Sequence, residues 1–103
     1  MAESSLTGAQ RTFLRGRGQR LDAALKIGRD GVTPALNAEL DRLLRAQELV
    51  KVRFVNADRD ERAALCERLA AEVACECVGA VGHTALFFRQ NPNPADRQYS
   101  FEA

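Results

Sequence analysis

The apolar residues change their period in the middle of the chain, and this change constrains the fold class. From Leu36 to Leu44, leucines recur at i, i+4, i+7 and i+8, the spacing of one face of an α-helix. Over residues 50–54, apolar residues then alternate with basic ones, which is the period of a half-buried β-strand. A helix followed at once by such a strand predicts an α/β fold.

Start signals place two further helices around this pair. A Ser, Thr or Asp cap, with Glu or Gln three residues later or Pro directly after, is typical of a helix N-terminus. Three such starts occur in the sequence: Thr7 with Gln10, Thr33 with Pro34, and Asp58 with Glu61. The first predicted helix is short and basic, and Gly16 and Gly18 are expected to end it. The third has Leu65, Leu69 and Val73 along one side.

The remaining segments complete a regular alternation. Residues 22–27 form a brief apolar segment that ends at Gly28 and is interpreted as a strand, although "AAL" alone could equally be helical. Residues 76–81 and 84–88 are predicted strands joined by a tight turn at Gly82-His83. The order helix-strand-helix-strand-helix-strand-strand indicates a two-layer sandwich of helices on a four-stranded sheet.

The amino-acid composition limits the classes of protein to which this chain can belong. The chain has 103 residues, of which 46% are hydrophobic and 28% charged, and this fits one globular domain. No apolar run approaches the roughly 20 residues that span a bilayer, and the N-terminus lacks a signal-peptide pattern, so we expect a cytoplasmic protein without membrane contact. Three cysteines are then expected to be reduced thiols. We expect flexible ends over residues 1–5 and 91–103, around a domain of residues 6–90.

Charge is unevenly distributed, although the net charge is only +1. Residues 11–29 contain six basic side chains against the single acid Asp22, whereas residues 58–76 contain six acids against three arginines. One explanation is simply that solvated faces differ in charge; the other is that the basic part binds an anionic partner.

The loop Gly28-Arg29-Asp30-Gly31 lies between a predicted strand and the helix start at Thr33-Pro34. Glycines allow unusual backbone angles and close approach by another backbone, and a helix N-terminus favours a phosphate. A Gly-x-x-Gly loop in this position is the clamp by which KH-type domains hold single-stranded nucleic acid. The same spacing also occurs in plain strand-to-helix connections. The loop alone therefore does not decide between a nucleic-acid clamp and a plain connection.

Four segments together resemble the CRM domain, the bacterial YhbY-like family of small RNA-binding proteins. They are "LTGAQRTFLRG", "LKIGRDGVTP", "ELVKVRFV" and "VGAVGHTALFFR", and the resemblance runs from about residue 6 to about residue 89. It implies a KH-like fold with a mixed sheet, similar to the C-terminal domain of translation initiation factor 3. It also implies RNA binding at the Gly-x-x-Gly loop and, for bacterial single-domain members, association with precursors of the large ribosomal subunit.

Carried over residue by residue, the resemblance assigns the family's loop to residues 28–31 and its basic first helix to Arg11 and Arg15. The segment "RGRGQRLDAAL" replaces the family's usual apolar and histidine-containing approach to the first strand, and its Arg17 and Arg20 add charged donors. Asp30 puts a carboxylate at the position where the resemblance implies a bound phosphate. This side chain could point outward or cap the loop. The expected RNA-binding residues are Arg11, Arg15, Arg17, Arg20, Lys26, Gly28, Arg29, Asp30, Gly31 and Thr33.

Other kinds of site have little support in the sequence. Cys75-Glu76-Cys77 lacks the spacing of zinc ligands, and His83 has no nucleophile suggested beside it. We therefore expect no enzyme activity, no cofactor and no metal, and a monomer whose partner is ribosomal RNA. The alternative is a protein-interaction domain that uses the same fold without RNA.

Overall fold

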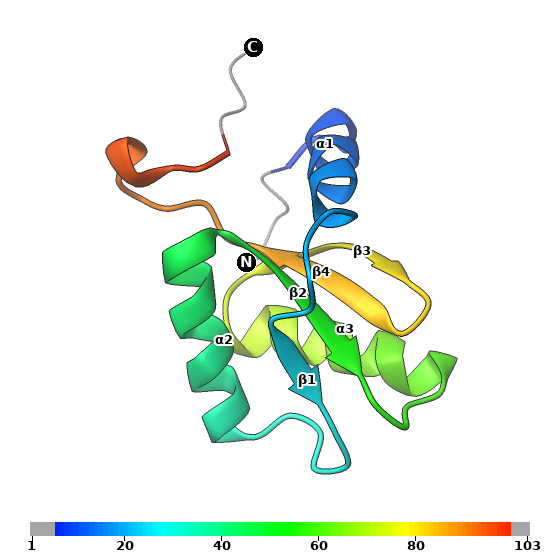
Figure 1. The fold of residues 1–103 in the computed structure, drawn as a ribbon. Helices are drawn as coiled ribbons and strands as arrows, with labels where there is room; N and C mark the ends of the chain where they lie inside the picture. Colours follow the sequence, from blue (N-terminus) through cyan, green and yellow to red (C-terminus); the bar gives the residue numbers. More distant parts are fainter. Residues whose placement is uncertain (1–5, 100–103) are drawn as a thin grey trace.

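The computed structural model describes residues 6–99 and has the predicted order of elements (Figure 1). The elements are α1 (Gly8–Gly18), β1 (Leu25–Ile27), α2 (Pro34–Gln47), β2 (Leu49–Phe54), α3 (Arg59–Glu72), β3 (Glu76–Val81), β4 (Thr84–Phe88) and a short 3-10 helix, η1 (Pro94–Asp96). The strands form one mixed sheet in the order β1-β2-β4-β3. β1 pairs with β2 in parallel, and the other pairs are antiparallel. The predicted α/β fold is confirmed.

All three helices begin where their capping residues predict. The Thr7 and Asp58 side chains each accept from the third amide of their helix, and the Gln10 and Glu61 side chains bond back to the cap amide. Thr33 caps α2 ahead of Pro34. Two boundaries differ from expectation: β1 covers only residues 25–27, and α1 continues through Gly16 to Gly18. A glycine inside a helix lowers its stability without necessarily ending it.

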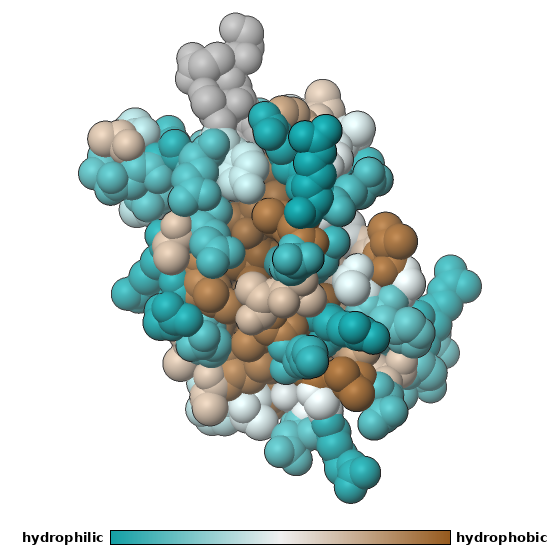
Figure 2. Space-filling model, in the orientation of Figure 1, coloured by the Kyte–Doolittle hydropathy of each residue, from teal (hydrophilic) through white to brown (hydrophobic). Residues whose placement is uncertain are grey.

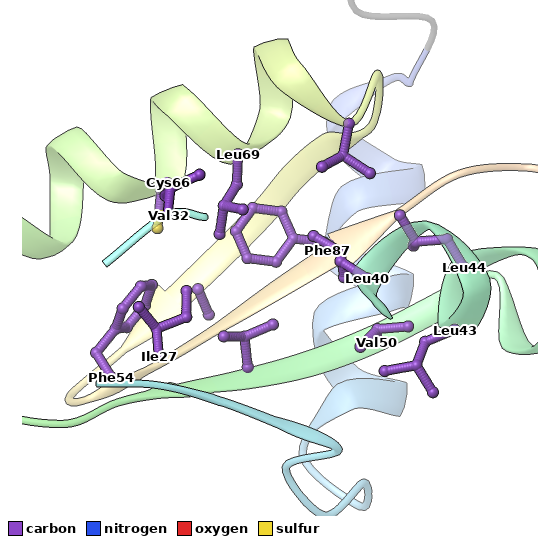
Figure 3. Close-up of a cluster of buried hydrophobic side chains, with 13 residues drawn as sticks. Ile27, Val32, Leu40, Leu43, Leu44, Val50, Phe54, Cys66, Leu69 and Phe87 are labelled. Carbon is purple, nitrogen blue, oxygen red and sulfur yellow. The ribbon is translucent and has the colours of Figure 1, made fainter. Parts of the chain in front are cut away.

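The larger core lies between the sheet and the pair α2 and α3 (Figure 3). Side chains at alternate strand positions point into it, among them Val50, Val52 and Phe54 of β2, while Leu40 and Leu69 come from the two helices. Phe87 of β4 is completely buried at the centre. Because side chains of a strand alternate between faces, the residues between these positions belong to the other face of the sheet.

That other face is covered only in part, by α1. Leu14 of α1 packs with Leu49, Val78, Leu86 and Phe88 in a second, smaller cluster. Close packing there depends on Gly18, because a Cβ at this position would lie 2.2 Å from Cδ1 of Leu86. Figure 1 shows α1 at one end of the sheet, apart from α2 and α3. The rest of this face carries polar residues and is called the open face below.

The segment after β4, for which a flexible tail is expected, makes hydrogen bonds from its backbone to Glu48 as far as Tyr99. The buried carboxylate of Glu48, at the end of α2, accepts backbone N–H bonds from Asn91, Gln98 and Tyr99. The ring of Tyr99 meets Phe88 edge-on, with the ring centroids 6.2 Å apart. Residues 100–103, and residues 1–5 at the other end, lie outside the described part of the chain.

Candidate nucleic-acid interface

The loop between β1 and α2 is a hydrogen-bonded turn. The Gly31 N–H donates to the Gly28 carbonyl oxygen at 3.0 Å, and Arg29 and Asp30 are exposed at its tip. Gly31 has φ +66°, a conformation that favours glycine, whereas Gly28 is not among the residues with positive φ. A Cβ at Gly28 would meet nothing within 4 Å. Gly31 therefore shapes the turn, and Gly28 leaves open space at which another molecule can approach the backbone.

The start of α2 offers fewer donors than its position suggests. Thr33 Oγ1 accepts the Leu36 N–H at 3.1 Å, its carbonyl oxygen accepts the Asn37 N–H, and Pro34 has no N–H. Among residues 34–37, this leaves Ala35 as the one amide without a hydrogen-bond partner in the described chain. Thr33 thus acts mainly as the helix cap, and a phosphate at this loop needs the side chain of Arg29 or the amides of the turn.

Basic side chains also line the open face beside the loop. Lys26 of β1 is in register with Arg53 of β2, and Arg53 with Thr84 of β4. Lys51 lies on the same face, because its neighbours Val50 and Val52 point into the larger core. Lys26 and Arg53 are exposed and Lys51 is half-buried. Lys51 and Arg53 are not among the RNA-binding residues expected from the sequence, although their alternation with apolar residues is a signal for them.

Arg11 and Arg15 hold α1 on the sheet. Arg11 donates to the carbonyl oxygen of Cys77 at 3.1 Å and forms an ion pair with Glu76. Arg15 donates to the carbonyl oxygen of Val78 at 3.2 Å and to Thr12 Oγ1 at 3.1 Å. Both guanidinium groups are thus used in the contact between α1 and β3. These two expected site residues are separated from the loop and serve the fold directly.

Arg17 and Arg20 lie elsewhere on or beside α1. The guanidinium carbon of Arg17 lies 5.2 Å from the ring centroid of Phe13. Arg20 is exposed directly after the helix. Figure 2 shows hydrophilic side chains standing out over α1 at the top and around the β1–α2 loop at the bottom, with less polar surface between them. The expected residues therefore form separate groups, one on or beside α1 and one at β1 and the β1–α2 loop.

Ion pairs distinguish these residues from three of the five arginines of α2 and α3. On those helices Arg42 pairs with Glu39, Arg45 with Asp41, and Arg68 with Glu72. The hydrogen bond from Arg42 lowers the pKa of Glu39, and that from Arg68 lowers the pKa of Glu72. By contrast, Arg17, Arg20, Lys26, Arg29, Lys51 and Arg53 form no ion pair with a carboxylate in residues 6–99. We call these six residues the basic side.

Cys75 and His83 belong to the other kinds of site considered for this chain. Burial raises the pKa of Cys75 to about 12, so this thiol is protonated at neutral pH and is a poor metal ligand or nucleophile. His83 lies in the β3–β4 turn, where its Nδ1 is 3.3 Å from Arg62. Within residues 6–99, no three His, Cys, Asp or Glu side chains gather closely enough to hold a metal ion. Over the same residues, every helix is too short or too polar to span a bilayer.

Known proteins resemble the chain over nearly its whole length. The family model of the CRS1 / YhbY (CRM) domain matches residues 6–89. A Pseudomonas aeruginosa protein named "Probable RNA-binding protein" is 37% identical over 90 residues, which cover 87% of this chain and 86% of the relative. A Haemophilus influenzae protein named "RNA-binding protein" is 28% identical over 86 residues, covering 84% and 87%.

A solved structure supports the same assignment. The solution structure of a Staphylococcus aureus protein superposes with a TM-score of 0.79 at 25% sequence identity, and the match covers 92% of this chain and 99% of that protein. The fold, the order of elements and the match over residues 6–89 agree with one another. The chain belongs to the CRS1 / YhbY (CRM) domain family.

Proposed function

We propose that this chain binds RNA through the basic side and catalyses no reaction. The observation that carries the proposal is the pattern of ion pairs: the arginines of α2 and α3 mostly have carboxylate partners, whereas the six residues of the basic side have none in the described chain. Basic side chains left without acidic partners are available to phosphates. The names of the relatives, which refer to RNA binding, support the same conclusion.

The proposed contacts divide by chemistry. Arg29 at the loop tip and Arg53 on the sheet neutralise phosphates, and Lys26 lies beside Arg53 on the neighbouring strand. Gly28 has open space at its Cα, which permits an RNA backbone to come close to the turn. Because contacts to phosphates do not read base identity, we expect affinity to depend strongly on salt and weakly on sequence.

We propose ribosomal RNA in precursors of the large subunit as the physiological partner of a monomeric, cytoplasmic protein. The support is the resemblance to bacterial single-domain CRM proteins and the small size of the domain, which fits a module that binds one region of a large RNA. A protein-interaction domain is the competing function, and the experiment below separates the two.

The test is cross-linking in cells, followed by sequencing of the recovered RNA. The chain is compared with a triple variant, Lys26→Glu, Arg29→Glu and Arg53→Glu, which reverses charge on the basic side. A matched control reverses Arg42, Arg45 and Arg68 on α2 and α3. We expect the unaltered chain and the control to enrich ribosomal RNA and the triple variant to lose it. Recovery of protein partners without RNA would instead support the interaction domain.

A further inference from the structure

Two cysteines from different elements meet in the larger core. Cys66 of α3 is buried, and its side chain points from the helix into this core (Figure 3). Cys77 of β3 packs against the same cluster and is in register with Phe87, which is completely buried at the centre. The two thiols are hydrogen-bonded to each other, and both are free. Their sulfur atoms are therefore already neighbours, at the point where α3 packs on β3.

The two thiols differ in their surroundings. The hydrogen bond with Cys77 and burial raise the pKa of Cys66, so this thiol keeps its proton at neutral pH. The hydrogen bond from Cys66 lowers the pKa of Cys77 to about 7, although burial opposes this shift. The charge of Arg11, whose guanidinium donates to the Cys77 carbonyl oxygen at 3.1 Å, acts in the lowering direction, and that of Glu76 opposes it. Because the thiolate is the reactive form, Cys77 is the nucleophile of the pair.

The third cysteine of the chain, Cys75, is placed differently. Its thiol is directed toward the carbonyl oxygen of Leu69, at 3.9 Å, and burial keeps it protonated. Cys77 is half-buried, so a small molecule can reach its sulfur from solvent, and the nearest thiol that it then meets is Cys66. Cys75 thus provides a control in the same chain and the same segment.

We propose that Cys66 and Cys77 form a redox modification site, which a hydroperoxide converts into a disulfide between α3 and β3. In the first step, the Cys77 thiolate attacks the terminal oxygen of the hydroperoxide, so that an S–O bond forms and the O–O bond breaks. Cys77 becomes a sulfenic acid, and the leaving alkoxide takes up the proton that the thiol released.

The second step uses the thiol that is already in contact. The sulfur of Cys66 attacks the sulfur of Cys77, the S–S bond forms and the S–O bond breaks. The hydroxide that leaves takes the proton of Cys66 and departs as water. Together the two thiols lose two electrons and two protons, and the hydroperoxide is reduced to an alcohol and water. A dithiol reductant reverses the modification, as is typical of intracellular disulfides that respond to oxidants.

The test uses the full chain, hydrogen peroxide in small excess and intact mass spectrometry. After the reaction the chain is unfolded, and the remaining thiols are blocked with N-ethylmaleimide. We expect the untreated chain to take up a maleimide on each of its three cysteines and the oxidised chain to take it up on Cys75 alone. Dithiothreitol should restore all three. Digestion with trypsin should show the peptide of residues 63–68 joined to that of residues 69–89, and Cys75→Ala should form the same link.

Two further variants separate the steps. Cys66→Ala should stop at a sulfenic acid on Cys77, which dimedone traps, and Cys77→Ala should form no disulfide. In the unaltered chain, the reaction should accelerate as the pH rises through about 7 and then level off, because the Cys77 thiolate is the attacking group.

The unaltered chain and Cys75→Ala decide the proposal, whatever the stability of the two variants in the core. The site is refuted if the oxidised chain still takes up three maleimides, if the link disappears in Cys75→Ala, or if the link joins two copies of the chain. An internal link that persists in Cys75→Ala and is reversed by dithiothreitol supports it. None of these results depends on RNA binding, so the proposed function is tested separately.

Discussion

The Gly31 N–H donates to the Gly28 carbonyl oxygen at 3.0 Å, and the two glycines that this bond joins have different roles. Gly31 has φ +66°, whereas Gly28 has an ordinary backbone conformation and open space beside its Cα. A side chain at Gly31 would therefore be strained whatever surrounds it. A Cβ at Gly28 would meet no protein atom within 4 Å and could clash only with a bound molecule.

This difference separates folding from binding at the loop. Gly31→Ala should lose about 1–2 kcal/mol of unfolding free energy, seen as a lower Tm, because a non-glycine residue is disfavoured at positive φ. Gly28→Ala should melt as the unaltered chain does and bind RNA more weakly, and Gly28→Asp should bind weakest because its charge repels phosphate. Normal RNA binding by both Gly28 variants would make the loop only a connector between strand and helix.

Asp30 allows a test in the other direction. Its carboxylate is exposed at the tip of the turn and makes no hydrogen bond or ion pair with another described residue, so it does not cap the loop. Asp30→Lys should tighten RNA binding and make the salt slope steeper, because it replaces a repulsive charge with an attractive one. Thermal melting should change by less than about 0.5 kcal/mol, as is usual for surface substitutions. If the affinity were unchanged, the loop tip would not contact the RNA.

Two exposed arginines provide a matched pair for the basic side. Arg29 has no acidic partner in the described chain, whereas Arg45 on α2 lies 3.0 Å from Asp41. In RNA titrations at several salt concentrations, Arg29→Ala should reduce the salt slope by about one unit, because one phosphate contact is lost. Arg45→Ala should leave the slope unchanged. Equal effects of the two substitutions would indicate attraction by overall charge and contradict a defined surface.

Much of the fold was predictable from local signals. Thr7, Thr33 and Asp58 cap their helices through residues only three positions away, so the pattern that predicts each helix is also the contact that begins it. The hairpin at Gly82-His83 is local in the same sense, and its glycine has φ +59°. Short-range chemistry of this kind can be identified in a sequence without knowledge of the tertiary structure.

The site was less predictable, because charge partners come from distant parts of the chain. In the sequence, Arg11 and Arg15 belong to the same basic stretch as Arg17 and Arg20. In the structure, however, their guanidinium groups donate to carbonyl oxygens of β3, whose residues lie more than sixty positions away. A count of basic residues cannot distinguish an arginine that holds two elements together from one that is available to a ligand. The contacts of the segment after β4 were unpredictable for the same reason, because Glu48, which accepts from its backbone, lies fifty residues before Gln98.

The two glycines of α1 should respond in opposite directions to the same substitution. A Cβ at Gly16 would meet nothing within 4 Å, so Gly16→Ala should raise the unfolding free energy by up to about 1 kcal/mol through helix propensity. A Cβ at Gly18 would overlap the buried side chain of Leu86, so Gly18→Ala should cost about 1–3 kcal/mol through overpacking. Chemical denaturation measures both. If Gly18→Ala were also stabilising, α1 would not pack on Leu86 in solution.

The most informative stability test is at Glu48, where a single carboxylate organises the segment after β4. Its Oε1 accepts from Gln98 and Tyr99, and its Oε2 accepts from Asn91. Glutamine has one carbonyl oxygen and one amide group, so in Glu48→Gln an NH₂ faces at least one backbone N–H that then has no acceptor. Because hydrogen bonds to a charged group contribute more than neutral ones, the expected loss is about 1.5–3 kcal/mol of unfolding free energy.

Amide hydrogen exchange should accelerate at Asn91, Gln98 and Tyr99 together, while the amides of β2 keep their relative protection. Glu39→Gln, on the surface of α2, is the control and should leave stability nearly unchanged, because exposed ion pairs contribute little. If exchange at the three amides stays slow in Glu48→Gln, then the contact between Tyr99 and Phe88, and not the carboxylate, holds this segment in place.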